Sequence, residues 1–162
     1  MSIFDLLNLL AEAKVEFVLV GGLAVALQGY QRATLDVDVV LAMDTKNVQN
    51  FISVAKASGL RPTMPVSLDS LAQPELIEQW YREKGMLAFS VRAPDTVAAV
   101  LDILVRPVVP FADLHRDATQ IAVGAICIPV ASIEHLIAMK TDTGRSKDLI
   151  DIAELRKIQA QK

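Results

Sequence analysis

The sequence predicts a mixed α/β domain with a helical C-terminus, and three observations point to that class. Short apolar segments rich in β-branched residues alternate with segments in which apolar residues recur every three or four positions. The last two such segments, at 133–142 and 147–159, are both helical. The chain has 162 residues, of which 52% are hydrophobic and 22% charged, so it suits a folded core rather than a disordered chain. We find no linker, repeat or low-complexity tract and expect one domain over residues 1–162.

The first part of the chain alternates helix and strand. Ser2 and Asp5 have the spacing of a capping box before an amphipathic run, which predicts the first helix. Gly29 is placed to end the second helix as a left-handed cap. The expected elements are a helix at 3–13, a strand at 15–20, a helix at 22–29, a strand at 35–42 and a helix at 45–59.

The second part contains more strands. Residues 61–74, rich in Pro and Ser, are expected to form a long loop, and Gly85 is expected to end the helix that follows it. Ser132 and Ser146 are the expected N-caps of the last two helices. The remaining elements are a helix at 74–85 and strands at 86–93, 97–106 and 120–130, which gives a mixed sheet of four or five strands.

Two aspartates lie on a strand that is otherwise apolar. Because side chains alternate along a strand, Asp36 and Asp38 share one face. Two carboxylates so close together repel each other, so either they lie in water at an exposed strand end or a cation sits between them. Asp102 lies in the apolar run "AAVLDILV", where an unpaired charge is costly to bury. The three acids are therefore expected to converge in one cleft.

Three carboxylates suit Mg²⁺ or Mn²⁺ better than zinc, because these hard cations prefer oxygen ligands. Such ions assist phosphoryl transfer. Gly21 and Gly22 stand between a strand and a helix, where backbone N–H groups can hold a phosphate without obstruction from a Cβ. The same glycines also have a purely steric interpretation, as a tight strand-to-helix turn.

These residues resemble the signature of nucleotidyltransferases of the DNA polymerase beta superfamily. The match comprises Gly21-Gly22, the later "RATLDVDVVL" and a third aspartate on a subsequent strand. The chain is more closely similar to minimal nucleotidyltransferases and to AbiEii-type toxins of toxin–antitoxin and abortive-infection systems. In those groups a C-terminal "K…GR-x-KD…D" pattern recurs, seen here in "KTDTGRSKDLID". The resemblance covers roughly residues 15–155 and implies a polymerase-beta-like fold.

The resemblance also implies roles for individual residues. Asp36, Asp38 and Asp102 would be the catalytic carboxylates and the ligands of Mg²⁺ or Mn²⁺, and Asp102 would take the proton of the attacking hydroxyl. Residues expected at the nucleotide are Gly21, Gly22, Arg32, Thr34, Lys140 and Arg145. Two of these nucleotide-binding assignments have structural alternatives. The "GRSKD" turn could instead fasten the C-terminal helices through local pairing of Asp148 and Asp151. Arg32 could be a solvated loop charge.

The implied function is metal-dependent transfer of a nucleoside monophosphate from an NTP, such as ATP, to a hydroxyl of a protein, an RNA such as tRNA or a small molecule. A toxin–antitoxin role would add a cognate partner protein. The chain ends soon after the expected core, without the extra acceptor-binding domain of many relatives, which leaves the acceptor open. The alternative function is a weakly active or inactive nucleotide-sensing or partner-binding module, similar to an antitoxin subunit.

Composition narrows the partners and the compartment. The net charge of −3 gives no basic footprint for tight or DNA-specific binding. No apolar run is long enough to span a membrane, and no N-terminal signal peptide is evident. The single cysteine, Cys127, lies in an apolar run and is expected to be a core residue, so a reducing cytoplasm is the simplest compartment. His115 and His135 lack the spacing of a zinc site.

Overall fold

A mixed β-sheet organises the structure, a computed structural model that describes residues 1–95 and 97–162. Within these residues the sheet has seven strands in the order β3-β4-β5-β2-β1-β7-β6. β1 pairs with β2 in antiparallel and with β7 in parallel orientation, and β2 pairs with β5 in parallel orientation. The strands are β1 (Phe17–Val20), β2 (Asp36–Leu41), β3 (Arg61–Pro62), β4 (Ala88–Arg92), β5 (Val100–Leu104), β6 (Thr119–Val123) and β7 (Ile126–Val130).

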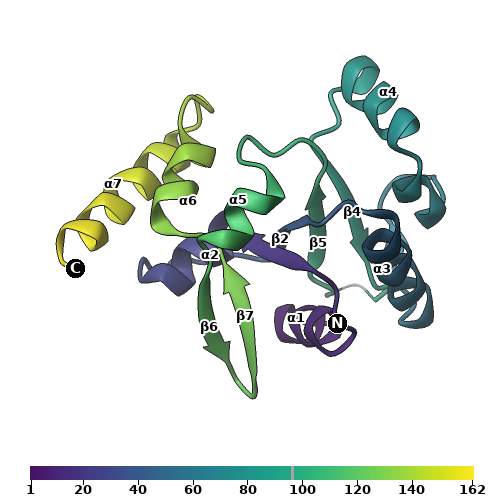
Figure 1. Cartoon of the computed structure of the whole chain (residues 1–162), viewed down its shortest axis with the longest axis horizontal. Helices are drawn as coiled ribbons and strands as arrows, with labels where there is room; N and C mark the ends of the chain where they lie inside the picture. Colours follow the sequence, from purple (N-terminus) through teal and green to yellow (C-terminus); the bar gives the residue numbers. More distant parts are fainter. Residues whose placement is uncertain (96) are drawn as a thin grey trace.

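The helices lie around this sheet in two groups. Figure 1 shows α6 and α7 together at one end of the molecule, far from α3 and α4 at the other. α2 contacts β1, β2, α6 and α7, so it joins the sheet to the C-terminal helices. The helices are α1 (Ile3–Glu12), α2 (Gly21–Gln28), α3 (Thr45–Ala57), α4 (Pro74–Lys84), α5 (Phe111–Arg116), α6 (Ile133–Lys140) and α7 (Ser146–Ala160), with a 3₁₀-helix η1 (Leu68–Ala72).

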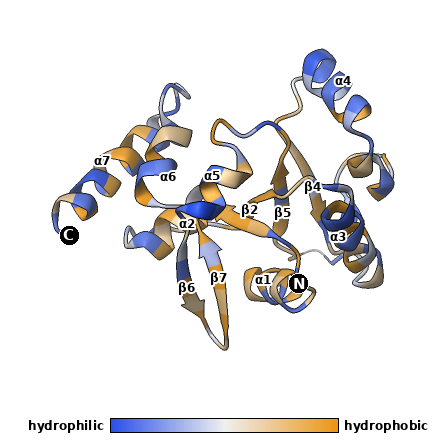
Figure 2. Ribbon diagram, viewed as in Figure 1, coloured by the Kyte–Doolittle hydropathy of each residue, from blue (hydrophilic) through white to orange (hydrophobic). Residues whose placement is uncertain are grey.

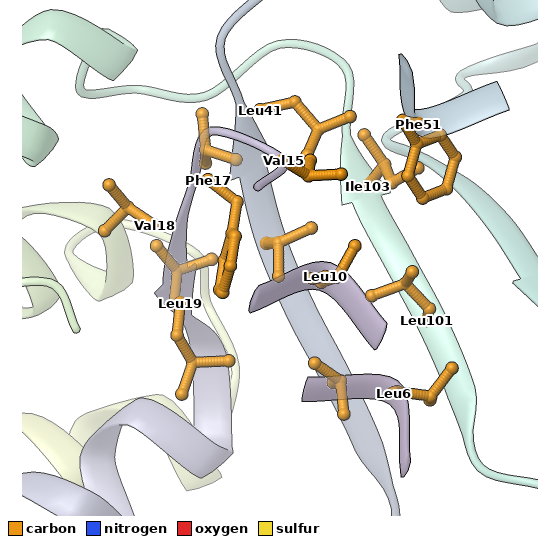
Figure 3. Close-up of a cluster of buried hydrophobic side chains, with 14 of the residues drawn as sticks. Leu6, Leu10, Val15, Phe17, Val18, Leu19, Leu41, Phe51, Leu101 and Ile103 are labelled. Carbon is orange, nitrogen blue, oxygen red and sulfur yellow. The ribbon is translucent and has the colours of Figure 1, made fainter. Parts of the chain in front are cut away.

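The core forms on one face of the central strands because their side chains alternate. Val37 and Val39 of β2 and Leu101 and Ile103 of β5 have no exposed surface. Figure 3 shows α1 side chains among those of the strands, and Leu6 of α1 belongs to the same buried cluster as Leu101. In Figure 2 the central strands are largely hydrophobic, while α4 is largely hydrophilic. The opposite face of β2 and β5 is therefore left for polar residues.

Most of the predicted elements are confirmed, including the capping box of α1 and the glycines that end α2 and α4. The Ser2 hydroxyl accepts a hydrogen bond from the Asp5 amide, and the Asp5 carboxylate accepts one from the Ser2 amide, which completes the capping box. Gly29 ends α2 with a φ of 128°, and Gly85 ends α4 in the left-handed conformation. The Ser132 hydroxyl caps α6 by accepting from the His135 amide at 3.1 Å.

The prediction of a single strand over residues 120–130 is wrong. The segment folds into a hairpin in which β6 pairs with β7 in antiparallel orientation. Gly124, with a φ of 62°, lies in the turn between the two strands. Glycine supplies that conformation without strain, and no polar residue marks the break in the apolar run. The expected four or five strands therefore become seven within the residues described, with the two-residue β3 as the other addition.

The expectation that Cys127 is a core residue is also wrong, because its side chain is exposed. β7 alternates, with Ile128 and Val130 fully buried and Cys127 on the opposite face. The β6–β7 hairpin extends from the body of the molecule in Figure 1, which leaves that face uncovered. The apolar segment of β7 therefore has one face in the core and one face exposed to solvent.

Three further features differ from the sequence prediction: the loop at 61–74, the N-cap of α7 and the helix α5. Residues 61–74 are not all loop, because they include β3 and η1. Ser146 is the first residue of α7 rather than its N-cap, which is Arg145, and no side chain of the described residues caps that helix. The short helix α5 carries no strong periodicity, and sequence analysis does not predict it.

Candidate active site

The register of the strands brings three aspartates together. Asp38 of β2 lies directly beside Asp102 of β5 in the parallel ladder, and Asp36 lies beside Val100 in the same ladder. Adjacent partners across a ladder project from the same face, so all three carboxylates lie on the face opposite the core. Asp36 is exposed, whereas Asp38 and Asp102 are half-buried.

These carboxylates line a cavity of about 290 Å³ between the sheet and the C-terminal helices. Its wall contains every residue that the sequence assigned to catalysis, metal ligation or nucleotide binding, which are Gly21, Gly22, Arg32, Thr34, Asp36, Asp38, Asp102, Lys140 and Arg145. It also contains Val20, Leu104, Leu136, Met139, Lys147 and Asp148. Acidic strand residues thus face basic residues of α6, α7 and the loop before β2.

The turn between β1 and α2 fits closely against the acidic cluster. Gly21 has a φ of 72°, and a Cβ at this position would lie 2.2 Å from Asp38 Oδ2. A Cβ on Gly22 would lie 3.3 Å from Arg32 Nη2 and 3.4 Å from Thr34 Oγ1. Steric fit therefore requires glycine at position 21, whereas at position 22 the neighbouring side chains would need to shift only slightly. Among the described residues no side chain caps α2, so its first N–H groups remain available for an anion.

The acidic cluster is electrostatically strained. Burial raises the pKa of Asp38 to about 7, with further contributions from the carboxylates of Asp102 and Asp36 and from a hydrogen bond with Asp102, while Lys140 opposes the shift. Burial and the charge of Asp102 also raise the pKa of Asp36, opposed by Lys147. A group of carboxylates with raised pKa values favours a proton or a cation among them.

The basic wall is tied to two buried aspartates of α7, each 1% exposed. Lys140 Nζ lies 3.2 Å from Asp148 Oδ1 and 2.9 Å from Asp151 Oδ2. Arg145 Nε donates to Asp148 Oδ2 at 2.7 Å, and Arg32 donates to Asp151. Arg32 is therefore not a free loop charge, and the "GRSKD" turn fastens the C-terminal helices while its cations also line the cavity.

Asp148 is an acceptor for three donors. Burial alone would raise the pKa of Asp148, but hydrogen bonds from Thr143, Lys140 and Arg145 outweigh burial and hold it below the usual range. Asp148 is therefore ionised at neutral pH and helps to hold Lys140 and Arg145 in place.

Residues 5–161 match the family described as nucleotidyl transferase AbiEii toxin, type IV TA system. The chain belongs to this AbiEii family. It is accordingly a member of a nucleotidyltransferase family, as the glycine pair and the aspartates predicted. No curated protein matches the chain. None of the helices within residues 1–95 and 97–162 is long and apolar enough to cross a membrane.

Three solved structures show the same fold. The lincosamide antibiotic adenylyltransferase LnuA, bound to lincomycin, is 20% identical with a TM-score of 0.60, covering 96% of this chain and 95% of LnuA. An antigenic nucleotidyltransferase-like protein from Paracoccidioides brasiliensis is 18% identical with a TM-score of 0.57 over 97% and 73% of the two chains. ANT(2")-Ia, in complex with adenylyl-2"-tobramycin, is 12% identical with a TM-score of 0.55 over 98% and 93%. The prediction of a nucleotidyltransferase fold is confirmed.

The donor set of this AbiEii chain fits a hard divalent cation in its chemistry. Three carboxylates on one face supply only oxygen donors, and their mutual repulsion is what a cation relieves. In the part of the chain described, no three His, Cys, Asp or Glu side chains already form a metal-binding group. Asp38 is turned against Gly21, and Asp102 accepts a hydrogen bond from Ser90. Metal ligation would therefore require at least one carboxylate to turn.

Two residues at the AbiEii site, Lys147 and Ser90, have no predicted role in the sequence patterns. Lys147 lines the cavity, is exposed and acts on the charge of Asp36. The position of Lys147 in the "GRSKD" turn, close to the predicted nucleotide-binding residue Arg145, is the sequence feature that could have identified it. Ser90 donates to Asp102 Oδ1 from the neighbouring strand β4. Only the pairing of β4 with β5 reveals this contact, so no local pattern identifies Ser90.

Proposed function

We propose that this AbiEii chain transfers a nucleoside monophosphate from an NTP to a hydroxyl acceptor in a reaction that depends on Mg²⁺ or Mn²⁺. One observation carries the proposal. Asp36, Asp38 and Asp102 share one face of the sheet and line one cavity with the uncapped start of α2. This combination supports an acidic cluster beside backbone N–H groups that could bind phosphate.

In this proposal one set of residues binds the phosphates of the NTP, and Asp102 acts on the attacking hydroxyl. The first N–H groups of α2 and the cations Lys140, Arg145 and Lys147 face the cavity and would bind the triphosphate. Arg32 and Thr34, beside Gly22, would support that loop. Positioning and neutralisation of phosphate charge provide most of the catalysis in phosphoryl transfer.

The transfer itself needs one proton acceptor. The acceptor hydroxyl forms a bond to the α-phosphorus, the bond from that phosphorus to the pyrophosphate oxygen breaks, and the hydroxyl proton passes to Asp102. Pyrophosphate leaves with the electron pair. When bound, Mg²⁺ or Mn²⁺ would neutralise phosphate oxygens and the charge of Asp36, Asp38 and Asp102.

The proposed acceptor is a hydroxyl of a protein, an RNA such as tRNA or a small molecule. Small molecules gain support from two neighbours of the same fold, one bound to lincomycin and one to adenylyl-2"-tobramycin. The family description supports a cognate antitoxin as partner. We also propose that residues 1–162 act as one domain in a reducing cytoplasm, where the exposed thiol of Cys127 would stay reduced.

The test incubates the chain with each α-labelled NTP, Mg²⁺ or Mn²⁺ and a host lysate. We expect label in one class of acceptor, and its loss in the Asp36→Asn/Asp38→Asn double variant. Asp69→Asn is the control, because Asp69 is an exposed acid paired with Lys56 on the surface. Label transfer that persists in the double variant would overturn the mechanism. NTP binding without transfer in the unmodified chain would support the nucleotide-sensing alternative.

A further inference from the structure

Four residues form one row across four neighbouring strands. Ser90 of β4 is the direct partner of Asp102 of β5, Asp102 of Asp38 of β2, and Asp38 of Val20 of β1. Direct partners share a face of the sheet, so the serine lies on the side of Asp102 away from Asp38. The row ends at the turn of Gly21.

Ser90 contacts the acidic cluster through a single hydrogen bond. Its Oγ donates to Asp102 Oδ1. Ser90 is half-buried and is not part of the cavity wall, whereas Asp102 is. Any effect of Ser90 on the reaction therefore passes through Asp102. A hydrogen bond to an ionised acceptor is among the stronger ones, particularly where water is partly excluded.

The bond leaves the two oxygens of Asp102 in different situations. The Ser90 hydroxyl donates to Oδ1, so the carboxylate cannot rotate without breaking that hydrogen bond. Oδ2 receives no hydrogen bond from the serine. A carboxylate torsion is otherwise broad, so without the serine the Asp102 carboxylate is held only by its hydrogen bond with Asp38 and has more freedom of orientation. Reactions that depend on positioned groups lose rate when such freedom returns.

We propose that Ser90 is a positioning residue, which fixes the Asp102 carboxylate so that its second oxygen serves the cavity. The inference rests on the proposed function. It assigns a role to the strand β4, which contributes no residue to the cavity wall among the described residues. The neighbours Phe89 and Val91 are fully buried and belong to the core, so Ser90 is the β4 residue that reaches the acidic cluster.

The experiment compares Ser90→Thr with Ser90→Val, which have nearly the same shape and differ in the hydroxyl. Both suit a strand. In Ser90→Val we expect a loss of about ten- to a hundredfold in kcat or in affinity for metal, as for other groups that orient a ligand. KM for the NTP should stay within about twofold, because the phosphate contacts are intact. Ser90→Thr should remain close to the unmodified chain.

A second readout does not require turnover. The melting temperature is measured against the concentration of Mn²⁺ alone, because binding to the folded state raises it. We expect Ser90→Val to need about tenfold more Mn²⁺ for the same rise, and Ser90→Thr to need no more than the unmodified chain. Ser90→Ala repeats both measurements if the valine does not fold. Ser58→Ala, which removes a half-buried hydroxyl at the end of α3, is the control and should change neither.

The outcomes separate this inference from the proposed function. If the unmodified chain transfers label and Ser90→Val matches it in kcat and in Mn²⁺ response, the role of Ser90 is overturned while the function stands. A Ser90→Thr variant as impaired as Ser90→Val also overturns it, because the hydroxyl then does not matter. If the unmodified chain shows neither Mn²⁺ response nor transfer, both proposals fall.

Discussion

Gly21 and Asp38 are in such close contact that Gly21 cannot gain a side chain without moving Asp38. Gly21 has a left-handed φ of 72°, and the atom nearest to a Cβ at this position would be Asp38 Oδ2, at 2.2 Å. The turn thereby determines where one carboxylate of the site can lie. The same contact explains why the residue that follows β1 is glycine, and this explanation does not depend on phosphate binding.

Replacing Gly21 by alanine should therefore damage stability and activity together. We expect a loss of about 1–2 kcal/mol from the left-handed backbone alone, and a loss of transfer of about tenfold or more as Asp38 is displaced. Gly59→Ala is the matched control, because Gly59 has a φ of 77° and a Cβ added there would meet nothing within 4 Å. Urea denaturation and label transfer measure the two effects. Equal transfer in both variants would contradict this account.

The raised pKa of Asp38 gives stability a pH dependence of known sign. The pKa of Asp38 is about 7 in the folded chain against 3.8 as its ordinary value. The stability that protonated Asp38 contributes is therefore complete below about pH 4 and is lost as the pH rises through about 7. Without metal, the chain should melt at a lower temperature at pH 8 than at pH 6 on account of this group.

Asp38→Asn should remove this dependence, because the amide is neutral throughout. In EDTA at pH 8 we expect its melting temperature to exceed that of the unmodified chain by several degrees, since each kcal/mol corresponds to about 2–4 °C in a domain of this size. At pH 5 the difference should be smaller, and it should disappear only below about pH 4. Transfer should be lost at both pH values. A variant less stable than the unmodified chain at pH 8 would show that Asp38 is not strained.

At the scale of elements, α6 and α7 are joined by a buried network of charges rather than by apolar packing alone. Asp151 forms ion pairs with Lys140 of α6 and with Arg32 of the loop before β2, so one α7 residue holds two other segments. Removing one partner of a buried ion pair costs far more than removing a surface pair. The network therefore links the stability of the C-terminal helices to the basic wall of the cavity.

Asp148→Asn should lower the free energy of unfolding by about 3–5 kcal/mol at pH 7, because Lys140 is left buried with one acid fewer. Glu154→Gln is the control on the same helix, since Glu154 pairs with Lys157 at the surface and should cost less than about 1 kcal/mol. The pKa of Asp148 is lowered, so its contribution is present above about pH 4 and fades as the pH falls through its folded pKa. Urea denaturation at pH 7 and pH 3 should show the gap between Asp148→Asn and the unmodified chain narrowing.

Elements with local signals could be predicted, and those set by context could not. The capping box of Ser2 and Asp5 and the glycine at position 85 identify α1 and the end of α4 from sequence alone. The β6–β7 hairpin escapes prediction because its apolar run continues through the turn. The exposure of Cys127 escapes it because burial of one strand face depends on which elements cover it.

For the whole molecule, the sequence predicted which residues line the cavity but not how the strands pair. Alternation placed Asp36 and Asp38 on one face, and resemblance added Asp102 and the glycine pair. The direct pairing of Asp38 with Asp102 depends on a parallel register between distant strands, which no local pattern specifies. Ser90 and the double role of Lys140 depend on the same long-range pairing. Pattern therefore locates the acids, and topology supplies their neighbours.

The interior position of β1, between β2 and β7, has a consequence for how the chain is made. β1 leaves the ribosome early, yet one of its two partner strands, β7, is synthesised only after β6, and Asp151 of α7 follows later still. A growing chain therefore carries its glycine turn and the β2 aspartates Asp36 and Asp38 long before Arg32 and Lys140 gain their buried counter-charge. A chain whose synthesis stopped before α7 would therefore carry the glycine turn and the β2 aspartates without the buried acid that pairs with Arg32 and Lys140.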